Sequence, residues 1–232
     1  MIRGRDYSVV QSGGHPIDWA AEAGSGVRFA YLRCGVVNDG PDIDFARNAT
    51  GAIAAGIAVG PYEFYYDIAV GDNPSRAPEA QADALVKAAT VDGVLIGSLA
   101  GHLPPADDLE WPVESDRPKW GITSSVDARN HALASLQAIR ARFNRRPLAY
   151  TYPNYAAGIQ LAGDLRFLDY PLWLASYALT PQPIKPWAGW TVWQTSGGTV
   201  EFCKLLNGNR VPVDGDVIAD EASFAQLLAV TS

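Results

Sequence analysis

Two carboxylates separated by one residue, Asp108 and Glu110, are the side chains of this sequence best suited to acid–base chemistry. If Leu109 lies in a strand, its two neighbours share the opposite face, because successive side chains of a strand alternate. Two carboxylates on one face repel each other, so one of them keeps its proton to higher pH, as a general acid at neutral pH requires. An isolated pair of this kind is more often an ordinary solvated strand end. Whether this pair has a catalytic role must therefore be judged from the rest of the sequence.

Strand-like and helix-like segments alternate along the first two thirds of the chain. Runs rich in β-branched and aromatic residues predict strands, and apolar residues at helical spacing predict the helices between them. The predicted strands are 3–8, 27–34, 57–65, one within 97–111, 147–151, 172–177, 190–194 and 213–218, and the main predicted helices are 17–23, 43–55, 79–90, one that opens at Ser124, 154–162 and 221–228.

This alternation predicts an α/β fold with a parallel sheet and helical crossovers. Eight strand candidates in one chain favour a closed, TIM-like barrel over an open sheet. Neither a low-complexity linker nor an internal repeat divides the sequence, so we expect a single domain over residues 1–232.

Polar and aromatic residues lie where the predicted strands end, which is where parallel barrels place their active sites. These residues are Asp6, Arg33, Tyr62, Phe64, Asp108, Glu110, Tyr177, Gln194 and either Asp214 or Asp216. A cleft with several carboxylates and aromatic walls is the general form of a glycosidase site, with acids for the glycosidic oxygen and rings for the sugar faces.

Composition excludes several other classes of function. The net charge of −7 and the absence of a basic cluster argue against a nucleic-acid partner. No apolar run approaches the length that spans a membrane, and the first ten residues lack the apolar core of a secretory signal. The three histidines are scattered, so we expect no metal site and no cofactor.

Cys34 and Cys203 are predicted to be free thiols.

Several short motifs follow one another along the chain in a characteristic order. Together they resemble the glycoside hydrolase family 25 muramidases, the lysozymes common among phage endolysins and bacterial wall enzymes. The motifs are Gly4, Asp6 and Ser8; Ile17-Asp18-Trp19; Asp44 and Phe45 through Asn48 to Gly56; Gly60-Pro61-Tyr62-Glu63-Phe64; Asp108-Leu109-Glu110; Pro171 to Tyr177; Trp193-Gln194; and Val213-Asp214.

The resemblance implies a modified barrel of five β/α units followed by three further strands. Because it runs from Gly4 to about Leu228, we expect no separate wall-binding domain. It implies hydrolysis of the β-1,4 bond between N-acetylmuramic acid and N-acetylglucosamine in peptidoglycan. Glu110 would be the general acid, and Asp108 would stabilise the developing positive charge or orient the substrate's 2-acetamido group. Asp6 and Asp214 would complete the acidic floor and raise the pKa of Glu110.

Seven further residues are expected to bind the substrate, and several of them have a second interpretation. They are Tyr62, Phe64, Arg33, Tyr177, Trp173, Gln194 and Trp111. Trp173 is of a residue type that more often fills a core, and Trp111, like Trp120, either stacks on sugars or anchors the loop after Glu110. Arg33 either pairs with Asp6 or contacts the peptide or carboxylate of muramic acid. For the last carboxylate we prefer Asp214 to Asp216, because Asp214 follows Val213 as in the family motif.

Two other functions compete with the muramidase. One is a barrel that binds wall glycan without cleaving it, for example as a tail or surface adaptor, and the other is a glycosidase that acts on chitin-like polymers. The complete set of Asp6, Asp108, Glu110 and Asp214 favours an enzyme. We expect a monomer, unless the chain is part of a virion. We also expect action on the bacterial cell wall in phage lysis or wall penetration, with delivery by a holin or a virion, or with export of a bacterial enzyme by another route.

Overall fold

Eight strands close into a barrel in the computed structural model, which describes residues 1–36, 40–64, 77–110 and 125–229. Seven neighbouring strands are parallel: β1 (Ile2–Tyr7), β2 (Phe29–Val36), β4 (Ala58–Phe64), β7 (Ala106–Asp108), β8 (Leu148–Thr151), β9 (Leu172–Ala175) and β10 (Val192–Lys204). β11 (Arg210–Ile218) closes the ring as an antiparallel strand between β10 and β1. The short β3 (Gly40–Pro41) extends β2 outside the ring, and β5 (Thr90–Val91) and β6 (Val94–Leu95) form a separate hairpin.

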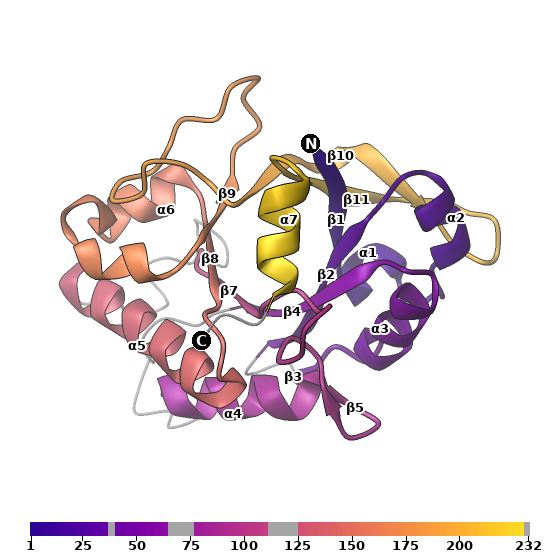
Figure 1. The fold of residues 1–232 in the computed structure, drawn as a ribbon, viewed down its shortest axis with the longest axis horizontal. Helices are drawn as coiled ribbons and strands as arrows, with labels where there is room; N and C mark the ends of the chain where they lie inside the picture. The colour runs from indigo at the N-terminus through magenta and orange to yellow at the C-terminus, as the bar shows by residue number, and fades with distance from the viewer. Residues whose placement is uncertain (37–39, 65–76, 111–124, 230–232) are drawn as a thin grey trace.

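Helices follow each of the first five barrel strands and cover the outside of the sheet (Figure 1). They are α1 (Val9–Ser12) and α2 (Trp19–Gly24) after β1, α3 (Phe45–Ala54) after β2, α4 (Pro78–Ala89) after β4, α5 (Ser125–Phe143) after β7 and α6 (Pro153–Gly158) after β8. Two 3₁₀ turns, η3 (Leu161–Gly163) and η4 (Leu165–Asp169), lead into β9. The expected succession of five β/α units and three strands is therefore confirmed.

Aromatic rings fill the inside of the barrel, and two further clusters fill the space between sheet and helices. Phe29, Tyr31 and Trp173 are almost completely buried in the interior cluster. Gly4 makes room for one of these rings, because a Cβ at this position would lie 2.3 Å from the Phe29 ring. The last helix, α7 (Glu221–Leu228), closes the end of the barrel where β2 begins, since Phe224 packs on Phe29 with 6.1 Å between ring centroids. The opposite end of the barrel, where the parallel strands finish, holds the candidate active site.

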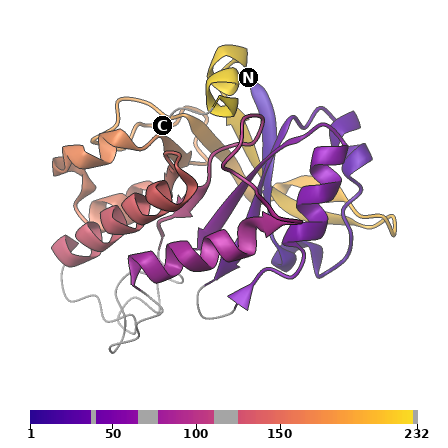
Figure 2. The ribbon, with the colours of Figure 1, turned by 60° about the horizontal axis from the view of Figure 1, so that its bottom comes forward.

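Helices α4 and α5 pack against each other on the side of β4 and β7 (Figure 2). The stripe of Leu133, Leu136, Ile139 and Phe143 predicted for α5 is buried. Within the residues that the structure describes, we find no helix that is both long and apolar enough to cross a bilayer. Cys34 and Cys203 are buried and free, as expected from the sequence.

Three predicted elements differ from the structure. No helix was predicted between the first strand and residue 17, yet Ser8 and Gln11 form a capping box at the start of α1. This signal was readable in the sequence. The strand predicted over 190–194 continues to Lys204, because its far half pairs with β11 beyond an irregularity between Ser196 and Glu201. The helix predicted over 154–162 ends near Gly158, since Gln160 adopts a left-handed conformation with φ of 56°.

Candidate active site

A cavity of about 190 Å³ opens at the carboxyl ends of the barrel strands. Its lining combines carboxylates, aromatic rings and a few polar side chains from both halves of the chain. The lining residues are Asp6, Ser8, Val10, Gln11, Arg33, Tyr62, Phe64, Asp108, Glu110, Tyr150, Trp173, Gln194 and Asp214. Of the expected site residues in the described part of the chain, only Tyr177 is missing from this lining, while Trp111 lies outside the described residues.

Asp108 and Glu110 both face this cavity, on either side of a buried Leu109. Asp108 is the last residue of β7, and the Leu109 N–H still donates to the Tyr150 carbonyl on β8 at 2.9 Å. The extended backbone thus continues past the strand end and sends Leu109 into the cluster under α5. The alternation predicted from the sequence is therefore correct at this position.

The environment of this pair favours protonated carboxyl groups near neutral pH. Burial, followed by the negative charge of Asp214, raises the pKa of Glu110 to about 7. Burial, followed by the charge of Glu110, raises the pKa of the more deeply placed Asp108 well above its ordinary value. Interacting carboxyls release their protons as a pair. Together they can therefore supply a proton and a carboxylate to one bond.

Three more carboxylates lie on β1 and β11 at the back of the cavity. Asp6 and Asp214 are register partners on the two antiparallel strands. Burial, then the charges of Asp216 and Asp214, raises the pKa of Asp6 well above its ordinary value. Asp214 lines the cavity, whereas Asp216 is buried beneath it and accepts a hydrogen bond from Trp173 Nε1 at 2.8 Å. The geometry thus places Asp214 at the cavity surface and Asp216 under the floor.

The side-chain amide of Gln194 forms hydrogen bonds with three polar side chains at the cavity. Its Nε2 donates to Asp6 Oδ2 at 2.8 Å, and its Oε1 accepts from the hydroxyls of Tyr150 and Tyr177, each at 3.0 Å. Tyr177 is mostly exposed and does not line the cavity, so it lies at the rim. Tyr150 was not among the predicted site residues, although it lies near the end of a predicted strand, as the predicted site residues do.

Aromatic rings form the rest of the wall and the floor. Trp173 is 1% exposed and packs edge-on against Tyr62 and Tyr150, with centroids 6.0 and 4.9 Å apart. It is thus mainly a core residue whose edge reaches the cavity. Tyr62 and Phe64 both line the cavity, so Glu63 between them points away from it, as the alternation of side chains along a strand requires.

Arg33 faces the cavity but does not pair with Asp6, so that interpretation of the sequence is wrong. The structure shows no ion pair between these two residues, and Asp6 is instead held by Gln194. The positive charge of Arg33 acts on Asp108, where it opposes the increase in pKa caused by burial and neighbouring carboxylates. Ser8, Val10 and Gln11 also line the cavity and were not among the predicted site residues.

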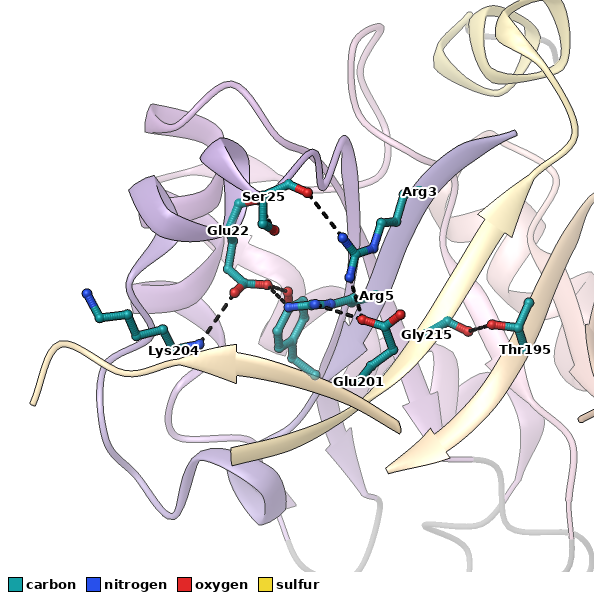
Figure 3. Close-up of polar contacts among 9 residues, drawn as sticks. Arg3, Arg5, Glu22, Ser25, Thr195, Glu201, Lys204 and Gly215 are labelled. Carbon is teal, nitrogen blue, oxygen red and sulfur yellow. Dashed lines mark hydrogen bonds and ion pairs between the residues drawn. The ribbon is translucent and has the colours of Figure 1, made fainter. Parts of the chain in front are cut away.

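A partly buried network of charged and polar side chains connects β1 to its neighbours (Figure 3). Arg5 pairs with the buried Glu22 of α2 and, at 2.8 Å, with Glu201 of β10. The Tyr7 hydroxyl donates to the same carboxyl group of Glu22 at 2.6 Å, and Arg3 binds Glu201 at the surface. These contacts connect β1 to α2 and β10, so they fix the strand that presents Asp6.

Among residues 1–36, 40–64, 77–110 and 125–229, no group of three or more His, Cys, Asp or Glu side chains is arranged to hold a metal ion. The cavity lining offers carboxyl groups, one guanidinium, hydroxyls and two side-chain amides. A closed α/β barrel that gathers paired carboxyls and aromatic walls at its strand ends has the form of a glycoside hydrolase.

Comparison with known families agrees with this class. A family model described as glycosyl hydrolases family 25 matches residues 8–201, and the chain belongs to this family. It is thus a glycoside hydrolase of the lysozyme and muramidase type, a type that degrades peptidoglycan. A search of curated proteins finds no sequence that matches the chain.

Solved structures share the fold over nearly the whole chain. The bacterial lysozyme from Streptomyces coelicolor is 25% identical, with a TM-score of 0.75 over 98% of this chain and 95% of that one. The muramidase from Trichobolus zukalii is 22% identical, with a TM-score of 0.76 over 98% and 99%. A family 25 glycosyl hydrolase from Bacillus anthracis is 20% identical, with a TM-score of 0.74 over 97% and 93%.

Proposed function

We propose that this chain is an N-acetylmuramidase, which hydrolyses the β-1,4 bond between N-acetylmuramic acid and N-acetylglucosamine in peptidoglycan. The observation that carries the proposal is the pair of Asp108 and Glu110 at the cavity, whose pKa values are raised by burial and by neighbouring carboxylates, Glu110 in the case of Asp108 and Asp214 in the case of Glu110. A pKa near 7 suits a general acid at neutral pH. The neighbouring rings of Tyr62 and Phe64 offer apolar faces on which sugar rings can pack.

In the proposed mechanism, Glu110 donates its proton to the glycosidic oxygen as the bond to the anomeric carbon breaks. Glu110 suits this role because it is less buried than Asp108 and lies nearer the opening of the cavity. Asp108 then faces the developing positive charge, or orients the 2-acetamido group for attack on its own anomeric carbon. Water finally adds to that carbon and returns a proton to the enzyme.

Asp214→Asn should move the alkaline limb of activity to lower pH. The charge of Asp214 raises the pKa of Glu110, so its removal lowers that pKa and the acid form is lost earlier as pH rises. We expect the alkaline midpoint of the pH profile of kcat/KM, measured on purified peptidoglycan, to decrease. A profile that keeps its alkaline midpoint would mean that Asp214 does not act on the general acid.

Analysis of reaction products tests the bond specificity. Purified peptidoglycan is digested, the new ends are reduced with borohydride, and the fragments are identified by mass spectrometry. We expect reduced muramic acid, whereas reduced glucosamine would contradict the proposed bond. Chitin oligomers serve as the comparison substrate, since cleavage of these alone would indicate a chitin-type glycosidase. Binding to glycan with no new ends would favour a non-catalytic barrel.

Phage lysis or wall penetration remains an expectation from the sequence, as does the monomeric state. Purified protein can be added from outside to intact cells and, in parallel, to isolated walls. If the protein penetrates walls from outside, the turbidity of both suspensions should fall. Activity on isolated walls alone would instead favour release from within the cell. Light scattering of the purified chain measures its oligomeric state.

A further inference from the structure

Two more carboxyl groups are buried behind the cavity, on the outer face of the same two strands. Tyr62 and Phe64 face the cavity, so Glu63 between them points outward to the helices. Asp107, the residue before the cavity-lining Asp108, is buried and points outward as well. Glu63 and Asp107 are register partners on the neighbouring parallel strands β4 and β7. Adjacent strands lie about 4.8 Å apart, so the two side chains start side by side.

Neither carboxyl group has the partners that a buried charge requires. Glu63 is 3% exposed and Asp107 is fully buried. Glu63 Oε1 and both carboxyl oxygens of Asp107 lack a hydrogen-bond partner. Ser135 on α5 lies close enough to oppose the increase in the pKa of Asp107, but its Oγ does not meet the geometry of a hydrogen bond. A buried carboxylate without compensation is unfavourable, so these groups favour their protonated forms.

In the described part of the chain, no lysine or arginine forms an ion pair with either carboxyl group. The polar or titratable side chains on the elements packed around the pair are Cys34 on β2, Asp42 after β3, Gln81 and Lys87 on α4, and His131 and Ser135 on α5. Asp42 already accepts hydrogen bonds from the backbone N–H groups of Val9 and Asp44. Lys87 is exposed at the edge of a cavity of about 480 Å³ that it shares with Glu63, and in the described part of the chain the two form no ion pair.

We propose that Glu63 and Asp107 share one proton and act as a positioning pair for the active site. The protonated carboxyl group of one residue donates to the carboxylate of the other, and this bond joins β4 to β7 directly behind Asp108. The cavity beside Glu63 gives protons a route to solvent. Together, the pair fixes the strand ends that carry Tyr62, Phe64 and Asp108.

The pair also acts on the cleft through its charge. Burial raises the pKa of Asp107 to about 7, and burial with the charge of Asp107 raises that of Glu63 well above its ordinary value. The charge of Asp107 is in turn one of the causes that raise the pKa of Asp108. This second effect concerns catalysis and rests on the proposed role of Asp108, whereas the effect on stability does not.

The sign of the pH dependence follows from these directions. A carboxyl group whose pKa is raised by folding binds its proton more tightly in the folded state. Its contribution to stability is complete at pH values below its pKa in the unfolded protein, about 4. This contribution is lost as the pH rises through its pKa in the folded protein. For Asp107 this loss extends from about pH 4 to about pH 7, and for Glu63 to higher pH.

The test replaces both groups by amides, in the variant E63Q/D107N. Gln and Asn keep one donor and one acceptor in the same shape but do not titrate. Melting temperatures of wild type and variant are measured from about pH 5 to about pH 9. We expect wild type to lose at least about 5 °C relative to the variant across this range. The exposed Glu221, changed to Gln, is the matched control and should give a curve parallel to wild type.

The pH profile of kcat/KM separates positioning from simple packing. Loss of the charge at position 107 lowers the pKa of Asp108, which acts as a carboxylate in the proposed mechanism. The acid limb of the double variant should therefore move to lower pH, while its melting temperature improves at high pH. A packing defect is not expected to produce these two changes together. If hydrolysis fails altogether, the melting curves still test the pair independently.

A measurement on wild type covers the case that the double variant does not fold. Carboxyl ¹³C shifts are followed by NMR as the labelled protein is titrated, with E63Q as the variant that assigns the signals. We expect two coupled transitions, one near pH 7 and one higher. Two independent transitions near pH 4, or parallel melting curves of wild type and E63Q/D107N, would overturn the proposal.

Discussion

Glu110→Gln is expected to lower the rate of peptidoglycan cleavage by about 10²–10⁴-fold, the usual contribution of a general acid. The amide has the size of the carboxyl group but carries no proton that it can transfer to the glycosidic oxygen. Glu110 lines the cavity beside Asp108 and has a pKa of about 7, which is the property that the substitution removes. The rate is measured from reducing ends released per enzyme and per minute.

Two controls give this result its meaning. Glu221→Gln makes the same chemical change on the exposed surface of α7, outside the cavity, and should leave the rate unchanged. Binding of Glu110→Gln to insoluble peptidoglycan should persist, because the aromatic walls are intact. A variant that cleaves at the wild-type rate would move the acid role to Asp108, where Asp108→Asn is then the informative substitution.

Arg5→Ala is expected to cost about 3–5 kcal/mol in the free energy of unfolding. The substitution leaves Glu22 as a buried carboxylate, with its Arg5 ion pair gone and only the Tyr7 hydroxyl and a long backbone contact from Lys204 beside it. Equilibrium unfolding in urea, followed by tryptophan fluorescence, measures the change. Because β1 carries Asp6 on its other face, we also expect the activity of the folded fraction to fall.

Arg3→Ala is the matched control for this prediction. Arg3 binds the same Glu201, but its side chain is 40% exposed, so its removal should cost no more than about 1 kcal/mol. Equal losses for Arg3→Ala and Arg5→Ala would show that burial of the Arg5–Glu22 pair does not control stability. A loss confined to Arg5→Ala would identify the network in Figure 3 as the support of β1.

Local patterns in the sequence determined much of the fold and the main acid pair. The period of apolar residues predicted the barrel strands and α5, and the alternation around Leu109 correctly placed Asp108 and Glu110 on one side. The same alternation placed Glu63 away from the cleft. These features depend on neighbours in the chain, and a strand or a helix fixes them whatever it packs against.

Tertiary structure alone decided how distant residues meet. Asp214 rather than Asp216 reaches the cavity, Gln194 joins Asp6 to two tyrosines, and Arg33 acts on Asp108 instead of pairing with Asp6. Each of these depends on the register between strands far apart in sequence and on closure of the ring. The pairing of Glu63 with Asp107 is of the same kind: each is an unremarkable acidic residue in its own segment. They become a buried pair only because β4 and β7 lie side by side in register under the helices.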